Sequence, residues 1–121
     1  MKGNNLRQMD IIIIIIKIHE LIIQLQLMTP EIIKLKQIFD NLIGQFNLST
    51  LNSVFHEFEP YGYTGLYLLS ESHLSFHTWP EHNKICLDIF SCSKNINYDN
   101  IIEFLRKSFI TNNIDMLKIN R

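Results

Sequence analysis

Six consecutive isoleucines, Ile11 to Ile16, constrain the fold of this 121-residue chain more than any other stretch. β-Branched side chains favour extended backbone, and an unbroken apolar run is typical of a strand covered on both faces. We therefore expect the apolar segment from Ile11 to Ile23 to form a buried central strand. Glu20 is a charged residue within that segment, so it either lies near the strand end and reaches water or belongs to a site.

The remaining pattern predicts a mixed architecture. Thr29, Pro30 and Glu31 supply an N-cap hydroxyl, a proline at the first helical position and an early acid, which together predict a helix start. Apolar residues then recur at steps of three and four and form one stripe, made of Ile32, Leu35, Phe39, Leu42 and Phe46. A second helix is expected after Asn97. Further strands are expected over residues 51–58, 64–70, 84–91 and 114–119.

This order of elements favours an α+β fold. Strands that follow one another closely in the middle of the chain pair most simply as antiparallel neighbours. We expect a two-layer sandwich in which an antiparallel β-sheet carries two helices packed on one face. The sequence contains no internal repeat, linker or low-complexity tract, so a single domain over residues 1–121 is expected.

Composition argues against several functional classes. A net charge of −1 offers no basic surface for nucleic acid or an anionic membrane. No apolar segment is long enough to span a bilayer. The two cysteines, Cys86 and Cys92, are too few and too close together for a disulfide framework. Reduced thiols in a cytoplasmic protein are the simpler expectation.

Reactive side chains concentrate between Ser70 and Cys92, which makes this stretch the expected functional region. It holds three of the five histidines, both cysteines and the only tryptophan. Ser72 could act as a nucleophile with His77 as its base, because His77 follows five positions later, beyond a short turn-prone link. The Gly-x-Ser-x-Gly context of a nucleophile elbow is absent, so ordinary serine hydrolase chemistry is poorly supported.

A metal site is a weaker interpretation of the same stretch. Its potential zinc ligands match no standard motif in their spacing: His73, His77, His82, Cys86 and Cys92. Cys86 fits a small core residue, whereas Cys92 stands at the end of a predicted strand among polar residues and is the better functional candidate. We therefore predict no bound metal.

Five blocks of sequence share one family pattern: Ile18-His19-Glu20-Leu21, Phe55-His56-Glu57-Phe58-Glu59-Pro60-Tyr61-Gly62, Glu71-Ser72-His73, His77-Thr78-Trp79-Pro80-Glu81 and Asp88-Ile89-Phe90-Ser91-Cys92. Together they resemble the self-processing, pyruvoyl-dependent S-adenosylmethionine decarboxylases of the short prokaryotic type. The blocks keep their expected separations without gaps, and the likeness covers about residues 16–110.

The resemblance implies that the chain cleaves itself between Glu71 and Ser72. An N-to-O acyl shift at this bond, elimination and hydrolysis would leave a β chain of residues 1–71 and an α chain of residues 72–121. The α chain would begin with a pyruvoyl group made from Ser72, which is the implied cofactor. His77 matches the residue that takes up the proton in the elimination, a role that suits a neutral imidazole.

The resemblance also implies roles in catalysis and binding. The pyruvoyl carbonyl would form a Schiff base with the substrate amine and accept electrons as CO₂ leaves. Cys92 matches the proton donor, because a thiol is mostly protonated at neutral pH. Phe58 matches an aromatic residue that stacks on adenine, and Glu81 a carboxylate that binds the ribose hydroxyls. Glu20 belongs to a matching block and is a further substrate-binding candidate.

Thr64 stands where the family usually has a serine that supports processing. Threonine keeps the hydroxyl, so we expect slower but competent cleavage. The implied activity is conversion of S-adenosylmethionine to its decarboxylated form and CO₂ for spermidine biosynthesis, by an (αβ)₂ homodimer with active sites at its two-fold interface. One alternative is a pyruvoyl-dependent arginine or ornithine decarboxylase, and another is an inactive, unprocessed homologue with a binding or structural role.

Overall fold

The computed structural model describes residues 10–18, 31–91 and 96–120. Its elements, in chain order, are β1 (Asp10–Lys17), α2 (Glu31–Gln45), β2 (Thr50–Glu57), β3 (Tyr63–Leu69), β4 (His73–Trp79), the 3₁₀ turn η2 (Pro80–His82), β5 (Lys84–Ser91), α3 (Tyr98–Phe109) and β6 (Ile114–Asn120). No helix in this described part of the chain is both long and apolar enough to cross a membrane.

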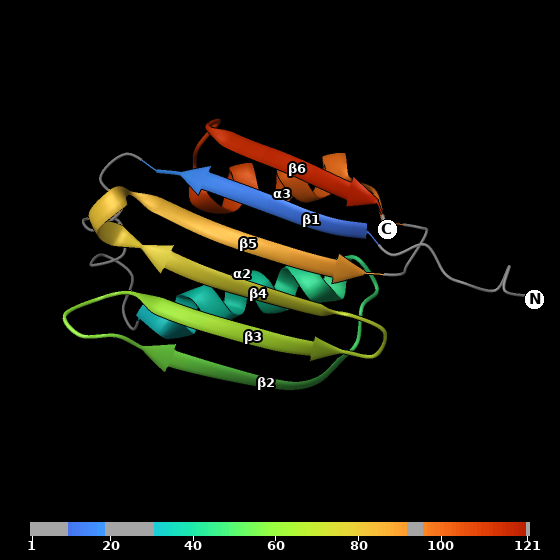
Figure 1. Cartoon of the computed structure of the whole chain (residues 1–121), viewed down its shortest axis with the longest axis horizontal. Helices are drawn as coiled ribbons and strands as arrows, with labels where there is room; N and C mark the ends of the chain where they lie inside the picture. The colour runs from blue at the N-terminus through green and yellow to red at the C-terminus, as the bar shows by residue number, and fades with distance from the viewer. Residues whose placement is uncertain (1–9, 19–30, 92–95, 121) are drawn as a thin grey trace, which may run out of the picture.

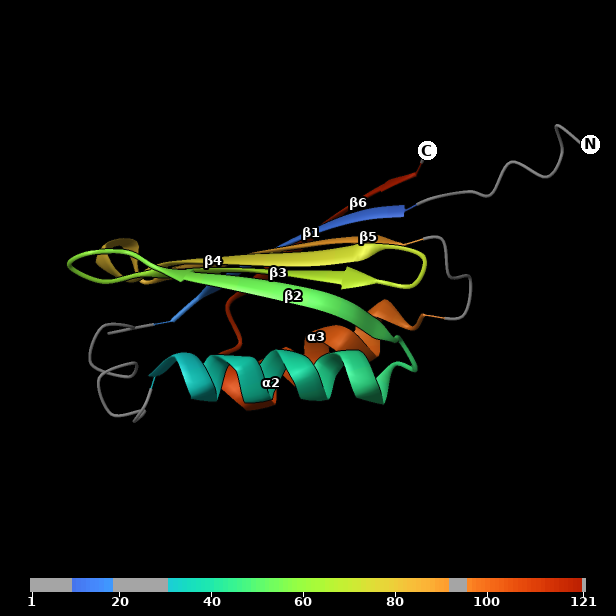
Figure 2. The same ribbon diagram turned by 90° about the horizontal axis from the view of Figure 1, so that it is seen from below.

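The six described strands form one antiparallel sheet in the order β2-β3-β4-β5-β1-β6 (Figure 1). Both helices lie against the same face of this sheet (Figure 2). We call the opposite face, which neither helix covers, the outer face. The expected α+β two-layer sandwich with helices on one face is therefore confirmed.

The isoleucine run forms β1, which lies between β5 and β6. Side chains alternate across a strand, so Ile12, Ile14 and Ile16 point toward the helices and are fully buried. The intervening isoleucines are partly exposed on the outer face. The expected central strand is confirmed as far as Lys17, whereas Glu20 and the predicted helix start at residues 29–30 lie outside the described residues.

The link after Ser72 was expected to be turn-prone, and this prediction is wrong. Residues His73 to Trp79 form β4, which pairs with both β3 and β5 and brings the sheet to six described strands, one more than the sequence pattern predicted. Its apolar residues Leu74 and Phe76 alternate with polar ones and are buried. Because histidine and serine occupy the alternating positions, the sequence was not recognised as a strand with one covered face.

The core lies between the sheet and the two helices. The Phe39 ring of α2 stacks on Phe76 of β4 with ring centroids 4.4 Å apart, and it also contacts Phe109 of α3. At the edge of the core, the Tyr67 hydroxyl of β3 donates a 2.8 Å hydrogen bond to the Asp40 carboxylate of α2. Burial and this carboxylate raise the pKa of Tyr67 well above its ordinary value, so the neutral phenol remains the donor.

The second helix begins as expected. The Asn97 side chain accepts a 3.1 Å hydrogen bond from the Asn100 backbone N–H and caps the N-terminus of α3. Tyr98, the first residue of α3, donates a 3.2 Å hydrogen bond to Asp10 at the start of β1. Burial and the Asp10 charge raise the pKa of Tyr98 to about 12, so this contact between the layers persists at neutral pH.

Candidate active site

A threonine and a histidine meet on the outer face where β3 pairs with β4. Thr64 and His77 are direct cross-strand partners, and Thr64 Oγ1 lies 2.8 Å from His77 Nδ1. His56 of β2 pairs with Thr64 on one side, and Cys86 of β5 pairs with His77 on the other. Four groups capable of proton transfer or hydrogen bonding therefore form one row across the sheet.

A cavity of about 520 Å³ opens beside this row. It lies at the end of the sheet where the β2–β3 turn and the β4–β5 turn meet, at the left of Figure 1. Its lining combines three aromatic rings with two carboxylates and the Thr64–His77 pair, and comprises Phe58, Glu59, Pro60, Tyr61, Gly62, Thr64, His77, Thr78, Trp79 and Glu81. Neither lysine nor arginine is among these described residues.

The β2–β3 turn supplies much of the lining. Gly62 adopts φ +111°, a left-handed conformation that L side chains rarely adopt, and its carbonyl accepts a 2.8 Å hydrogen bond from the Phe58 N–H. The Phe58 side chain is 48% exposed and makes an edge contact with His56, with ring centroids 4.5 Å apart. The turn therefore holds an accessible aromatic face at the cavity.

The opposite wall of this cavity is formed by a short segment that directly follows β4. Glu81 lies in η2, which begins at the buried Pro80 and ends where Asn83 adopts a left-handed conformation. Trp79 is the last residue of β4, and its side chain is 45% exposed. The structure thus places Phe58 and Glu81, both predicted from the sequence, around one cavity together with Thr64 and His77. Tyr61 and Trp79 were not predicted as site residues.

Ser72 lies at the opposite end of β4, in the loop that joins β3 to β4. Its carbonyl accepts a 2.9 Å hydrogen bond from the Leu69 N–H. A smaller cavity of about 230 Å³ is lined by Asn47, Leu48, Ser70, Glu71, Ser72 and Ser91. Cys92 lies outside the described residues, but the preceding Ser91 ends β5 and lines this same cavity.

Within one chain, Ser72 is therefore separated from the predicted residues that line the 520 Å³ cavity, which are Phe58, Thr64, His77 and Glu81. Ser72 and His77 stand five residues apart along an extended segment. Such a segment spans roughly 16 Å, at about 3.3 Å per residue. The sequence suggested that His77 could serve Ser72 across a turn, and this arrangement is wrong for a single subunit because β4 holds the two residues apart.

Cys86 also differs from its sequence interpretation. It was expected to be a small core residue, but it is only partly buried and lies on the outer face directly opposite His77. The alternation of β5 could have revealed this, because Ile85 and Leu87 occupy the buried face on either side. Among the described residues, no group of three histidine, cysteine or acidic side chains is arranged to hold a metal ion.

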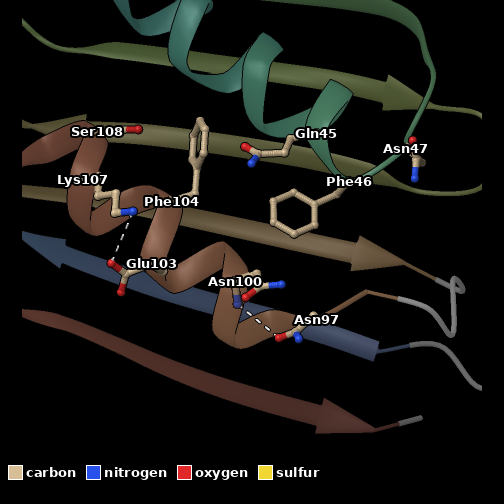
Figure 3. Close-up of a pocket in the computed structure, with 9 residues that line it drawn as sticks. All are labelled: Gln45, Phe46, Asn47, Asn97, Asn100, Glu103, Phe104, Lys107 and Ser108. Atoms are coloured by element: carbon tan, nitrogen blue, oxygen red, sulfur yellow. Dashed lines mark hydrogen bonds and ion pairs between the residues drawn. The ribbon is translucent and has the colours of Figure 1, made fainter.

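A larger cavity of about 730 Å³ lies elsewhere, between the C-terminal end of α2 and α3 (Figure 3). Several of its polar groups already have partners within the chain. Glu103 forms ion pairs with Arg106 and Lys107, and the Asn97 side chain caps α3. None of the residues predicted from the sequence as catalytic or substrate-binding lines this cavity.

Comparison with known proteins agrees with the fold and the sequence pattern. A family model described as S-adenosylmethionine decarboxylase matches residues 20–121. The S-adenosylmethionine decarboxylase proenzyme of Picrophilus torridus is 38% identical over 84 residues, which cover 69% of this chain and 65% of the relative. That of a Sulfurihydrogenibium species is 39% identical over 80 residues, covering 66% of this chain and 60% of the relative.

The matched region thus spans less than two thirds of either relative. A solved structure has a similar fold: the adenosylmethionine decarboxylase of Aquifex aeolicus VF5 superimposes with a TM-score of 0.71 at 21% identity, covering 95% of this chain and 90% of that one. The family model, the identity to curated relatives and the shared fold agree. The chain belongs to the S-adenosylmethionine decarboxylase family.

Proposed function

We propose that this chain is the proenzyme of a pyruvoyl-dependent decarboxylase that converts S-adenosylmethionine to decarboxylated S-adenosylmethionine and CO₂, for spermidine biosynthesis. The observation that carries the proposal is the cavity beside Thr64 and His77, which joins aromatic rings to carboxylates and has no described basic side chain except the histidine. This lining suits a ligand that is both cationic and planar.

The substrate offers matching chemistry. Its sulfonium cation is attracted to aromatic faces, an interaction of about 0.5–2 kcal/mol. Phe58 presents an accessible face to the adenine, and the two oxygens of Glu81 can accept hydrogen bonds from the ribose hydroxyls. Arginine and ornithine have neither adenine nor ribose, so they would not make these two contacts, which favours S-adenosylmethionine as the substrate.

The loop before β4 fits self-cleavage. The Glu71–Ser72 bond lies outside the strand ladder, so it can break without removing a sheet hydrogen bond. The Ser72 carbonyl stays bound to the Leu69 N–H, which keeps the new chain end attached to β3. A pyruvoyl group formed from Ser72 would supply the electrophilic carbonyl that accepts electrons during decarboxylation.

The Thr64–His77 contact suits proton uptake. If Nδ1 of His77 carries the proton and donates it to Thr64 Oγ1, the lone pair of Nε2 is free to accept the α-proton of Ser72 during cleavage. Thr64 would then fix both the tautomer and the orientation of the ring. Cys92 is the proposed proton donor after CO₂ loss, and Glu20 remains a proposed binding residue.

A second copy of the chain supplies the missing contact. His77 of the same subunit is about 16 Å from Ser72, which is too far for proton transfer. A two-fold axis that lies between two outer faces and runs across the strands would turn the partner's β4 antiparallel over the first. With the axis above the midpoint of residues 72 and 77, each Ser72 meets the partner's His77, and two equal sites form.

The outer face supports this (αβ)₂ homodimer. It exposes Leu66 and Leu68 of β3 by 41% and 51%, and Leu117 and Ile119 of β6 by 56% and 41%. The partly exposed isoleucines of β1 extend the β6 group, while largely polar outward residues of β4 and β5, such as Ser75 and Asp88, lie between the two groups. Exposed apolar groups on a sheet with only one covered face favour an interaction surface.

The test combines mass spectrometry with activity. The purified protein should separate under denaturing conditions into residues 1–71 and a C-terminal fragment that begins with pyruvoyl, and it should release CO₂ from carboxyl-labelled S-adenosylmethionine but not from arginine or ornithine. A chain that stays intact at 14.3 kDa and releases no CO₂ would support the inactive alternative instead.

Hybrid dimers test the shared site. Ser72→Ala and His77→Ala chains should each stay uncleaved and inactive alone. When the two are co-expressed, the hybrid has one complete site, so the His77→Ala chain should be cleaved and activity should appear. If no co-expressed sample is cleaved although the hybrid forms, Ser72 and His77 do not act across subunits.

A further inference from the structure

A histidine and a phenylalanine stack at the start of β4, next to the β3–β4 turn at the right of Figure 1. His73 of β4 and Phe90 of β5 are direct cross-strand partners. Their rings are nearly parallel, with an interplanar angle of 11° and centroids 5.3 Å apart. The neighbouring Leu74 and Ile89 are buried toward the helices, so the two rings lie on the outer face. We call this contact the His73–Phe90 stack.

The stack occupies the last rung of its ladder before the proposed cleavage site. The pairing of β4 with β5 runs from Trp79 opposite Lys84 to His73 opposite Phe90 and ends there. Ser72 directly precedes this rung and lies outside the strand. A ring contact in the middle of a sheet adds to stability, whereas one at the end of a strand also limits local fraying of that end. The stack therefore restrains the residue next to Ser72.

The backbone is anchored on both sides of Glu71. After the scissile bond, the Ser72 carbonyl accepts the 2.9 Å hydrogen bond from the Leu69 N–H, and the stack holds the following residue. Before the bond, the Ser70 N–H donates a 3.0 Å hydrogen bond to the Ser49 carbonyl. With these anchors in place, the backbone movement that cleavage requires is concentrated at the Glu71–Ser72 peptide.

The first step of cleavage depends on the geometry at this peptide. The Ser72 Oγ attacks the Glu71 carbonyl carbon, a C–O bond forms, the C–N bond breaks, and the hydroxyl proton passes to the freed Ser72 nitrogen. Removal of the Ser72 α-proton then expels the Glu71 carboxylate, and the dehydroalanine that remains takes up water and releases ammonia. Attack requires the oxygen to be held about 3–3.5 Å from the carbon, and a frayed strand end would seldom hold it there.

We propose that His73 is a positioning residue for self-cleavage, and that its ring, stacked on Phe90, holds Ser72 in the geometry from which the acyl shift starts. This inference rests on the proposed function, because it requires cleavage between Glu71 and Ser72. His73 acts through the backbone of Ser72 and not on the reacting atoms. The stack lies within one subunit, so the inference does not depend on where a two-fold axis lies.

The experiment follows fragment formation from freshly synthesised precursor by denaturing mass spectrometry. His73→Leu keeps an apolar strand residue but loses the flat ring, and it should slow cleavage roughly tenfold. His73→Phe keeps a ring that stacks on Phe90 and should cleave at close to the wild-type rate. Phe90→Leu should be as slow as His73→Leu, and the double variant should be no slower than either single variant, because both remove one contact.

Two controls separate positioning from stability and from association. Ile102→Ala removes a partly buried side chain of α3 that packs against the core, so it should lower the free energy of unfolding without slowing cleavage. Urea unfolding is measured with Ser72→Ala added to every variant, so that all chains are intact. Sedimentation at the concentration of the cleavage assay checks that each variant has the same association state as the wild type.

Three results would overturn the inference. His73→Leu could cleave at the wild-type rate, or Ile102→Ala could slow cleavage as much as His73→Leu at an equal loss of stability, which would leave the stack a structural role only. His73→Phe could be as inactive in cleavage as Ser72→Ala, which would assign the chemistry to the imidazole itself. Failure of the proposed function is recognised separately, because the wild-type chain would then remain intact in the mass spectrum.

Discussion

At the scale of single residues, the Thr64–His77 contact is the feature most directly linked to chemistry. A 2.8 Å contact across two paired strands fixes the imidazole far more tightly than a loop would. The sequence indicated His77 from its spacing to Ser72 and Thr64 only through resemblance, and it did not indicate their contact, since they are 13 positions apart and share no local motif. Pairing of β3 with β4 brings them together, and residue spacing alone does not reveal such register.

For the rate of self-cleavage, the hydroxyl of Thr64 should be more important than its methyl group. Thr64→Val keeps the shape but removes the hydrogen bond to His77, and it should slow self-cleavage by roughly 10- to 100-fold, a part of what a positioned base contributes. Thr64→Ser should cleave at least as fast as the wild type. A time course of fragment appearance by denaturing mass spectrometry measures both rates. Equal rates for valine and threonine would remove Thr64 from the proposed mechanism.

At the scale of elements, β4 carries the site and was the element that sequence analysis missed. Its inward residues Leu74 and Phe76 are apolar, but His73, Ser75 and His77 are among its outward residues and resemble a loop in composition. The other strands were predicted to within a residue or two over the described regions, because their apolar runs or alternation are stronger. Polar side chains that resemble a functional loop weaken the pattern that would otherwise identify the strand.

Gly65 shows how closely β3 and β4 are packed beneath the site. A Cβ at this position would overlap the Phe76 ring and lie 2.8 Å from Phe55. Gly65→Ala should therefore lower the free energy of unfolding by about 1–3 kcal/mol, as overpacked cores do. It should also slow self-cleavage, because its neighbour Thr64 would shift relative to His77.

Gly44 provides the matched control. It lies within α2, and a Cβ there would meet no atom within 4 Å. Gly44→Ala should raise the free energy of unfolding by about 0.5–1 kcal/mol, because alanine favours the helix and reduces the freedom of the unfolded chain. Urea unfolding measures both variants. An unchanged or stabilised Gly65→Ala protein would contradict the close packing between β3 and β4.

At the scale of the whole molecule, the outer face explains why part of the site was beyond sequence analysis. The strands alternate as if one face were covered by helices and the other were wet, yet Leu66, Leu117 and the outward isoleucines of β1 add apolar groups to that second face. The sequence therefore contained the signal for a second covered face. Which residues of two subunits would meet in the proposed dimer depends on its symmetry axis, which no single-chain pattern specifies.

The length of β4 has a kinetic consequence. If Ser72 and His77 act across subunits as proposed, a lone subunit cannot cut its own backbone, because the two residues lie at opposite ends of that strand, and maturation becomes a second-order event in dilute solution. The half-time of fragment formation should lengthen as freshly synthesised precursor is diluted below its dimer dissociation constant, and it should level off above that concentration. A half-time independent of dilution would mean cutting within one subunit. The dimer dissociation constant would thus set a threshold concentration, below which the chain accumulates as uncleaved, inactive precursor.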